Sequence, residues 1–217
     1  IVLSDTFWRS MRNSFIITVS TVTLNVSLAC MLAFAFTKLS FRGRKTIFNI
    51  LTIGLMFPIT VAILPIFTQI KQLDWIDSYW GVIFPLVAFG LPQSTIILRS
   101  FFIAVPNELA DASYVDGCTT FGFFRYILIP MARPAITAVV VIQIIISWNE
   151  YFLPLLILND DDLWTLPLGI MQFQAQFGTD WSRVMAYVTL LIIPAVVFYV
   201  FTEKYIVTGL IGGELKG

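Results

Sequence analysis

The chain has 217 residues, of which 58% are hydrophobic and 12% are charged, and its 13 basic and 13 acidic side chains cancel. Its mean hydropathy of +0.88 is well outside the usual range for a soluble domain and indicates a protein of the lipid bilayer. The sequence contains no histidine, which excludes histidine-based metal sites, histidine-dependent catalytic triads and histidine proton relays.

Five apolar segments follow one another along the chain, each near the roughly twenty residues that cross a bilayer. Their approximate bounds are 14–37, 46–70, 79–98, 135–158 and 184–202. So many apolar segments leave too few polar residues to cover the core of a soluble protein. We therefore predict an all-α integral membrane protein, a polytopic helical bundle in which residues 1–217 form a single transmembrane domain.

Lysine and arginine near the span ends predict the orientation of this bundle. Basic residues gather in the loop 38–45, in the loop at about 99–133 and after the fifth span, whereas the remaining loops are mainly acidic. We expect both basic loops and the C-terminus to lie in the cytosol. Five crossings then place the first dozen residues outside.

A polar block interrupts the apolar sequence within the loop 99–133. Pro106 and Asn107 predict the start of a helix, and Gly117 predicts a left-handed stop. The helix would be on the order of 15 Å long. Three small residues would let another protein approach its backbone closely: Ala110, Ala112 and Ser113. The block is therefore the part of the chain best suited to docking.

The same block resembles the cytoplasmic motif of permease subunits of importer-type ABC transporters, Glu-Ala-Ala, three residues, Gly, nine residues, Ile, one residue, Leu-Pro. The spacing is kept by Asp111-Ala112-Ser113, Gly117, Ile127, Ile129 and Pro130. Asp, Ser and Ile replace Glu, the second Ala and Leu conservatively. The shorter Asp111 side chain departs most from the family pattern.

The resemblance implies that this helix is the coupling helix, which sits in a cleft on a cytosolic ATPase subunit and faces a basic residue there with its motif carboxylate. An amphipathic connector without a partner is the alternative. The candidate ATPase-coupling residues are Asn107, Glu108, Leu109, Ala110, Asp111, Ala112, Ser113, Gly117, Ile127, Ile129 and Pro130.

The segment 147–151 places an amide and a carboxylate near the outer end of the fourth span, where a charge is costly unless it faces protein or water. We consider Asn149 and Glu150 as residues of the translocation path, with Gln143 two turns earlier. Alternatively, Glu150 simply reaches the membrane interface beside Trp148 and Tyr151. The Trp-Asn-Glu sequence is also similar to one in sugar-transporting members of the family.

The resemblance further implies the partners of the chain. These are a homologous second permease subunit, a cytosolic ATPase dimer, an extracytoplasmic solute-binding protein, the lipid bilayer and a sugar substrate, with no nucleic acid. The chain has no Gly-X-X-X-X-Gly-Lys-Ser/Thr loop, so ATP and magnesium would be bound by the partner and no cofactor or metal by this chain. Catalytic residues are not expected.

The implied setting is the cytoplasmic (inner) membrane of a bacterium or archaeon, with one further span before Ile1 giving six. The segment 159–183 would meet the binding protein or serve as a solvated connector, and the glycine-rich end at 209–217 resembles the tails of carbohydrate permeases. The expected substrate is a sugar or oligosaccharide. The alternatives are glycerol phosphate esters or another small polar solute and, more remotely, a secondary transporter, although the polar block has no second copy.

Overall fold

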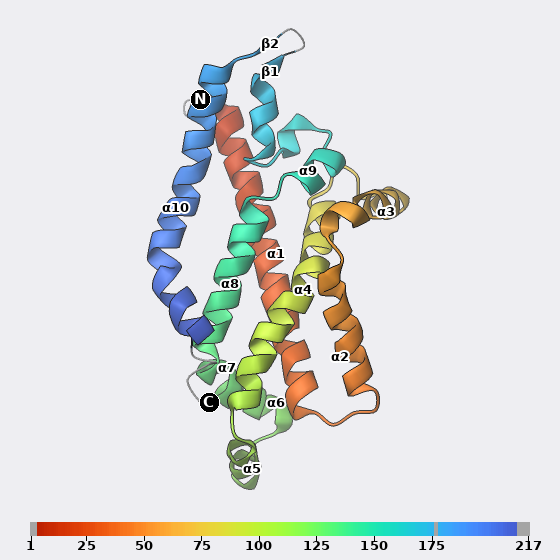
Figure 1. The fold of residues 1–217 in the computed structure, drawn as a ribbon, viewed down its shortest axis with the longest axis vertical. Helices are drawn as coiled ribbons and strands as arrows, with labels where there is room; N and C mark the ends of the chain where they lie inside the picture. The colour runs from red at the N-terminus through yellow and green to blue at the C-terminus, as the bar shows by residue number, and fades with distance from the viewer. Residues whose placement is uncertain (1–3, 176–177, 212–217) are drawn as a thin grey trace. The chain divides into compact units, whose positions relative to one another are not determined.

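The computed structural model describes residues 4–175 and 178–211 (Figure 1). The chain is predominantly helical, as expected. The longest helices are α1 (Asp5–Lys38), α4 (Tyr79–Ala104), α8 (Arg133–Trp148) and α10 (Trp181–Ile211). Between them lie α2 (Arg44–Ile53), η1 (Gly54–Met56), α3 (Ile59–Gln72), α5 (Asn107–Val115), α6 (Thr120–Gly122), η2 (Phe123–Leu128), α7 (Ile129–Met131), α9 (Phe152–Ile157), η3 (Asp161–Leu163) and η4 (Leu168–Phe173).

One small sheet departs from the all-α expectation. Strands β1 (Gln174–Ala175) and β2 (Gly178–Thr179) pair antiparallel, with Gln174 opposite Thr179. With two residues in each strand, this hairpin does not alter the helical character of the chain.

The described residues form two compact units, and the long helices pass through both. The first unit draws on Ile1–Thr23, Pro58–Ala88 and Gln143–Thr202, and the second on Leu24–Phe57, Phe89–Ile142 and Glu203–Gly217. Each has its own core. Phe7, Leu166 and Tyr187 are buried together in the first unit, and an apolar cluster that includes Phe102 and Leu128 fills the second.

Two of the predicted spans are continuous helices. The segments 14–37 and 79–98 lie within α1 and α4, and both helices are long and apolar enough to cross a membrane. In α1, Asp5 in the first turn and Lys38 in the last turn also suit the helix dipole. The predicted fifth span, 184–202, lies within α10, whose described apolar part, Trp181–Pro194, is shorter than a span.

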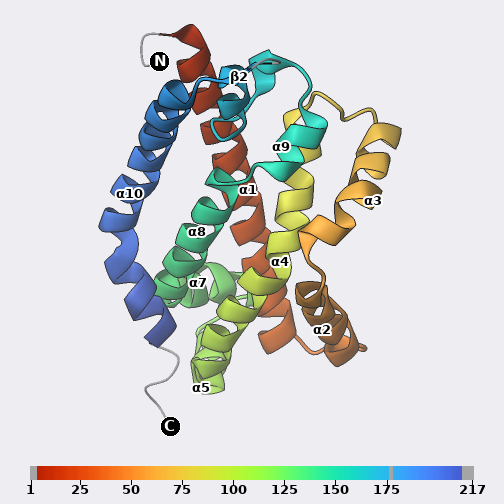
Figure 2. The ribbon, with the colours of Figure 1, turned by 45° about the horizontal axis from the view of Figure 1, so that its top comes forward.

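The predicted spans 46–70 and 135–158 are each interrupted rather than formed by one continuous helix. The first segment breaks after η1, where Phe57 and Pro58 are extended and Pro58 precedes α3. The second ends at Trp148, and α9 begins at Phe152 and packs against α3 (Figure 2). Among the described residues, two helices qualify as spans, or up to four if each bent pair is one span. The count of five is thus not confirmed.

Candidate functional site

Helix α5 has the predicted ends. Pro106 is extended at its start, and Gly117 has a φ of +83° after its last turn. The Gly117 N–H donates to the Tyr114 carbonyl at 3.1 Å and the Cys118 N–H donates to the Ser113 carbonyl at 2.9 Å. This pair of bonds is the Schellman arrangement, which satisfies carbonyls that a helix end leaves without partners. The glycine therefore sets where α5 stops, as the sequence predicted.

The inner face of α5 is made by two of the three small residues. Ala110 is 8% exposed and belongs to the core of the second unit, and Ser113 is also buried. The Ser113 hydroxyl donates to the Ala110 carbonyl at 2.7 Å, so its polar group is satisfied within the helix. Two of the three small residues that were predicted to admit a partner therefore face their own unit. Small side chains at 110 and 113 instead let α5 lie close to its own unit.

The outer face of α5 consists of Glu108, Asp111, Ala112 and Val115, all exposed. Their spacing of three or four residues places them on one side of the helix. Val115 is 88% exposed, which leaves nearly its whole apolar side chain uncovered. Leu109 flanks this face and is also exposed. The outer face thus combines two carboxylates with an uncovered apolar side chain.

Two exposed aromatic side chains follow α5 and were missed by the sequence reasoning. Phe121 lies in α6 and Tyr126 in η2, and both leave more than half of their surface uncovered. Figure 1 shows α5 at the end of α4, next to α6. A run of aromatic residues in a polar loop was a usable signal, because exposed aromatic residues often mark interaction surfaces.

The last residues of the motif support the loop. Ile127 and Ile129 are half-buried and pack against the core of the second unit. The helix around them is π-helical from Phe123 to Leu128. It precedes Pro130, which has no N–H to donate to the carbonyl of Tyr126. These motif residues therefore fix how the loop joins α8.

The three path candidates differ in their surroundings. Gln143 is 1% exposed and has interactions within the chain. The Asn149 side-chain amide donates to the Ile145 carbonyl at 2.8 Å, and the Glu150 carboxylate accepts from the Leu153 N–H at 3.1 Å. Glu150 thus caps the first turn of α9, and Asn149 closes the end of α8. Both polar side chains therefore bind backbone groups at the break between α8 and α9.

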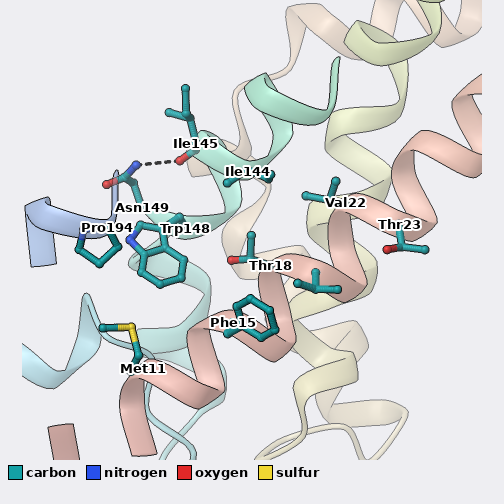
Figure 3. A pocket seen from close by; sticks show the side chains of 11 residues that line it. Met11, Phe15, Thr18, Val22, Thr23, Ile144, Ile145, Trp148, Asn149 and Pro194 are labelled. Carbon is teal, nitrogen blue, oxygen red and sulfur yellow. Dashed lines mark hydrogen bonds between the residues drawn. The ribbon is translucent and has the colours of Figure 1, made fainter. Parts of the chain in front are cut away.

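A cavity of about 460 Å³ lies in the first unit and is mainly apolar (Figure 3). Asn149 lines it, whereas Gln143 and Glu150 do not. Thr18 is 4% exposed, and neither its hydroxyl nor the Trp148 indole N–H has a hydrogen-bond partner in the described part of the chain. The lining residues are Met11, Phe15, Thr18, Val19, Val22, Thr23, Ile144, Ile145, Trp148, Asn149 and Pro194.

Asn13 organises the segment that follows α9, and the sequence reasoning did not find this role. Its side-chain amide donates to the carbonyls of Asp162 at 2.8 Å and Trp164 at 3.0 Å. Its oxygen accepts from the Tyr79 hydroxyl at 2.8 Å. Asn13 is 0% exposed, and its three bonds are at least partly buried. A lone Asn-Ser pair at the head of an apolar helix gives little sign of such a network.

The chain matches the model of one protein family over residues 25–206, described as the binding-protein-dependent transport system inner membrane component. The probable ABC transporter permease protein YurM of Bacillus subtilis is 32% identical, over 94% of this chain and 68% of the relative. The arabinooligosaccharides transport system permease protein AraQ of Halalkalibacterium halodurans is 31% identical, over 97% and 75%. The sn-glycerol-3-phosphate transport system permease protein UgpE of Salmonella typhimurium is 36% identical, over 98% and 76%.

Solved structures share the fold. A bacterial ABC transporter that imports the acidic polysaccharide alginate has a chain with a TM-score of 0.81 and 22% identity, covering 94% of this chain and 76% of that one. The MetNI methionine ABC transporter, in an inward-facing conformation, gives 0.62 and 14%, covering 94% of both chains. At these identities the likeness speaks for the fold alone.

Proposed function

We infer that this chain, which belongs to the family of inner membrane components of binding-protein-dependent transport systems, is a permease subunit of an ATP-driven importer. It is not an enzyme, and a separate ATPase subunit hydrolyses the ATP. The family match over residues 25–206, on a fold shared with ABC importers, is the observation that carries this inference.

The outer face of α5 is the surface that docks on the ATPase subunit. This proposal is supported by the division of α5 into a buried inner face and an outer face. The apolar Val115 side chain on the outer face is left uncovered by the described residues. Glu108 and Asp111 on the same face suit a basic cleft on the partner. Exposed Phe121 and Tyr126 extend the apolar contact.

The other predicted coupling residues act from inside. Ala110 and Ser113 hold α5 against the second unit, and Gly117 ends the helix. Ile127, Ile129 and Pro130 join the loop to α8. Because a docked helix transmits force only if its base is fixed, these residues matter for coupling without touching the partner.

Docking on a cytosolic ATPase sets the orientation of the chain. The loop at 99–133 and the C-terminus lie in the cytosol of a bacterium or archaeon, and the segment 159–183 lies outside, where a solute-binding protein arrives. The basic residues of the loops 38–45 and 99–133 support this assignment. The five spans that we propose are α1, α2 with α3 as one bent span, α4, α8 with α9, and α10. A homologous permease subunit completes the path.

The transported solute is a sugar or oligosaccharide. The arabinooligosaccharides system among the relatives supports this class, and the sn-glycerol-3-phosphate system supports a phosphate ester as the second candidate. The cavity of the first unit favours a neutral solute, because none of its lining residues is charged. Thr18 and Trp148 offer a hydroxyl and an N–H to sugar hydroxyl groups. Asn149 is then the path residue, whereas Gln143 and Glu150 support it.

Charge reversal on the outer face tests the docking surface. In Asp111→Lys the new cation faces the basic cleft, and we expect co-purification of the ATPase subunit to fall by about tenfold or more. Asp161→Lys is the matched control, because Asp161 is also an exposed acid but lies far along the chain. Equal ATPase retention in both variants would contradict docking through α5.

Uptake into proteoliposomes tests the class of transporter and its solute. The chain, its partner permease, the ATPase and the binding protein are reconstituted together. Labelled arabinotriose and labelled sn-glycerol 3-phosphate are then offered separately. ATP-dependent uptake of the trisaccharide alone is the expected result, and uptake of the phosphate ester alone selects the second candidate. Uptake driven by an ion gradient, with no nucleotide-binding subunit associated, would identify a secondary transporter instead.

A further inference from the structure

Lys38 lies where α1 ends and contacts the corner between α4 and α5, which we define as residues 104–107. Its ammonium donates to the Val105 carbonyl at 2.7 Å and to the Asn107 side-chain oxygen at 2.9 Å. Val105 is buried, whereas Asn107 is the first residue of α5. A single side chain thus joins the last residue of α1 to both sides of this corner.

The charge of Lys38 suits one helix end at the corner and opposes the other. The C-terminal end of α4 carries a partial negative charge, which favours a cation there. The N-terminal end of α5 carries a partial positive charge, but Glu108 in its first turn offsets it. Hydrogen bonds from a charged donor are stronger than neutral ones. The contact is therefore suited to hold under load.

The covalent connections of α5 make this contact important. The two residues Val105 and Pro106 join α5 to α4, whereas the chain after α1 leads away to α2. Helix α1 therefore contacts the corner through non-covalent interactions that include the Lys38 bonds. Farther along the loop, Phe34 of α1 packs on Phe124 of η2, with ring centroids 4.8 Å apart. Apolar packing resists separation but directs a displacement less strictly than a bond with defined geometry.

We propose that Lys38 is a positioning residue for coupling, a latch that makes α1 follow the α4–α5 corner when the ATPase moves α5. This role rests on the proposed function, because it needs a partner that displaces α5. Helix α1 also carries Met11, Phe15 and Thr18 of the apolar cavity. Helix α5 is joined to α4 by the chain, so α4 moves with it directly. Through Lys38, α1 would move with α5 as well.

Three variants separate the latch from a structural role. Lys38→Met keeps the length and apolar stem of the side chain but removes both hydrogen bonds. Lys38→Arg keeps a charged donor and is expected to retain coupling. Lys45→Met is the matched control, because Lys45 is an exposed lysine in the neighbouring helix α2.

Spin labels give a readout that needs no identified solute. One label is placed on Cys118 after α5 and one on Leu28→Cys in α1, in a Cys30→Ser background; both sites lie in the second unit. Distances are measured in the complete transporter, first without nucleotide and then trapped with ATP and vanadate. We expect the distance to remain unchanged on trapping in the parent protein, Lys38→Arg and Lys45→Met, and to shift or broaden in Lys38→Met.

Solute transported per ATP hydrolysed provides the second measurement, with arabinotriose and sn-glycerol 3-phosphate each tested. We expect Lys38→Met to lower this ratio by about fivefold or more, with the ATPase subunit still bound. A label distance that stays unchanged on trapping in Lys38→Met would overturn this proposal. A distance that shifts in Lys38→Arg would overturn it as well. Absence of the ATPase from the purified parent complex would instead overturn the proposed function, so the two failures are distinguishable.

Discussion

The loop around α5 and the segment 159–168 are both irregular connections, but they are held by different forces. The segment 159–168 is fixed by hydrogen bonds from residues far away in the sequence. Asn13 binds the carbonyls of Asp162 and Trp164, and the Asp77 carboxylate accepts the N–H groups of Asn159 and Asp160. The loop around α5 is held mainly by apolar packing, with Lys38 as its long-range polar contact.

The same difference continues at the end of the segment 159–168. The Ser14 hydroxyl accepts from the Leu166 N–H at 2.7 Å, and the Tyr187 hydroxyl donates to the Leu166 carbonyl at 2.9 Å. Arg9 forms an ion pair with Asp162. Buried polar networks specify one geometry, whereas apolar packing tolerates small sliding. The segment 159–168 is thus held in one geometry by a polar network, whereas the position of the α5 loop depends on apolar packing and on Lys38.

The largest effect is expected from Asn13→Leu, which removes the centre of the rigid segment. Two backbone carbonyls and the Tyr79 hydroxyl lose their shielded partner, at a cost of about 3 kcal/mol. The melting temperature of the purified complex should fall by on the order of 10 °C. Asn49→Leu, at an exposed position in α2, is the control. A similar small change in both variants would show that the network does not stabilise the segment.

A smaller effect is expected from Gly117→Ala, which strains the α5 loop. A side chain at a φ of +83° costs roughly 1 kcal/mol. Gly43→Ala is a close match, because Gly43 has a φ of +86° and an added Cβ meets nothing within 4 Å at either site. Both variants should lose similar stability in thermal unfolding, but Gly117→Ala should also retain less ATPase subunit. Equal retention would mean that the end of α5 does not position the docking face.

The smallest effect is expected at Glu150. Glu150→Gln keeps an oxygen that accepts the Leu153 N–H, so stability should change by about 0.5 kcal/mol or less. Glu150→Ala removes the acceptor and should cost about 1 kcal/mol. ATP-driven uptake at equal membrane levels should persist in Glu150→Gln. Loss of uptake in that variant, with normal thermal unfolding, would return Glu150 to the translocation path.

The sequence by itself determined the features that depend on neighbouring residues. Long apolar runs gave α1 and α4, and the Pro106-Asn107 start with the Gly117 stop gave α5. These features are local, because backbone φ preferences and helix-end hydrogen bonds act over a few residues. The spaced motif from Asp111 to Pro130 also identified the family before any fold was known.

Only the tertiary structure decided which side chains are buried, which stay exposed and which form long-range hydrogen bonds. Composition could not tell that Ala110 and Ser113 turn inward while Ala112 faces outward, because all three are small. The partners of Asn13 lie 66, 149 and 151 residues away along the chain, and those of Lys38 lie 67 and 69 residues away. Hydrogen bonds across such separations exist only once the helices have packed, since nothing in the local sequence marks the residue that will accept them.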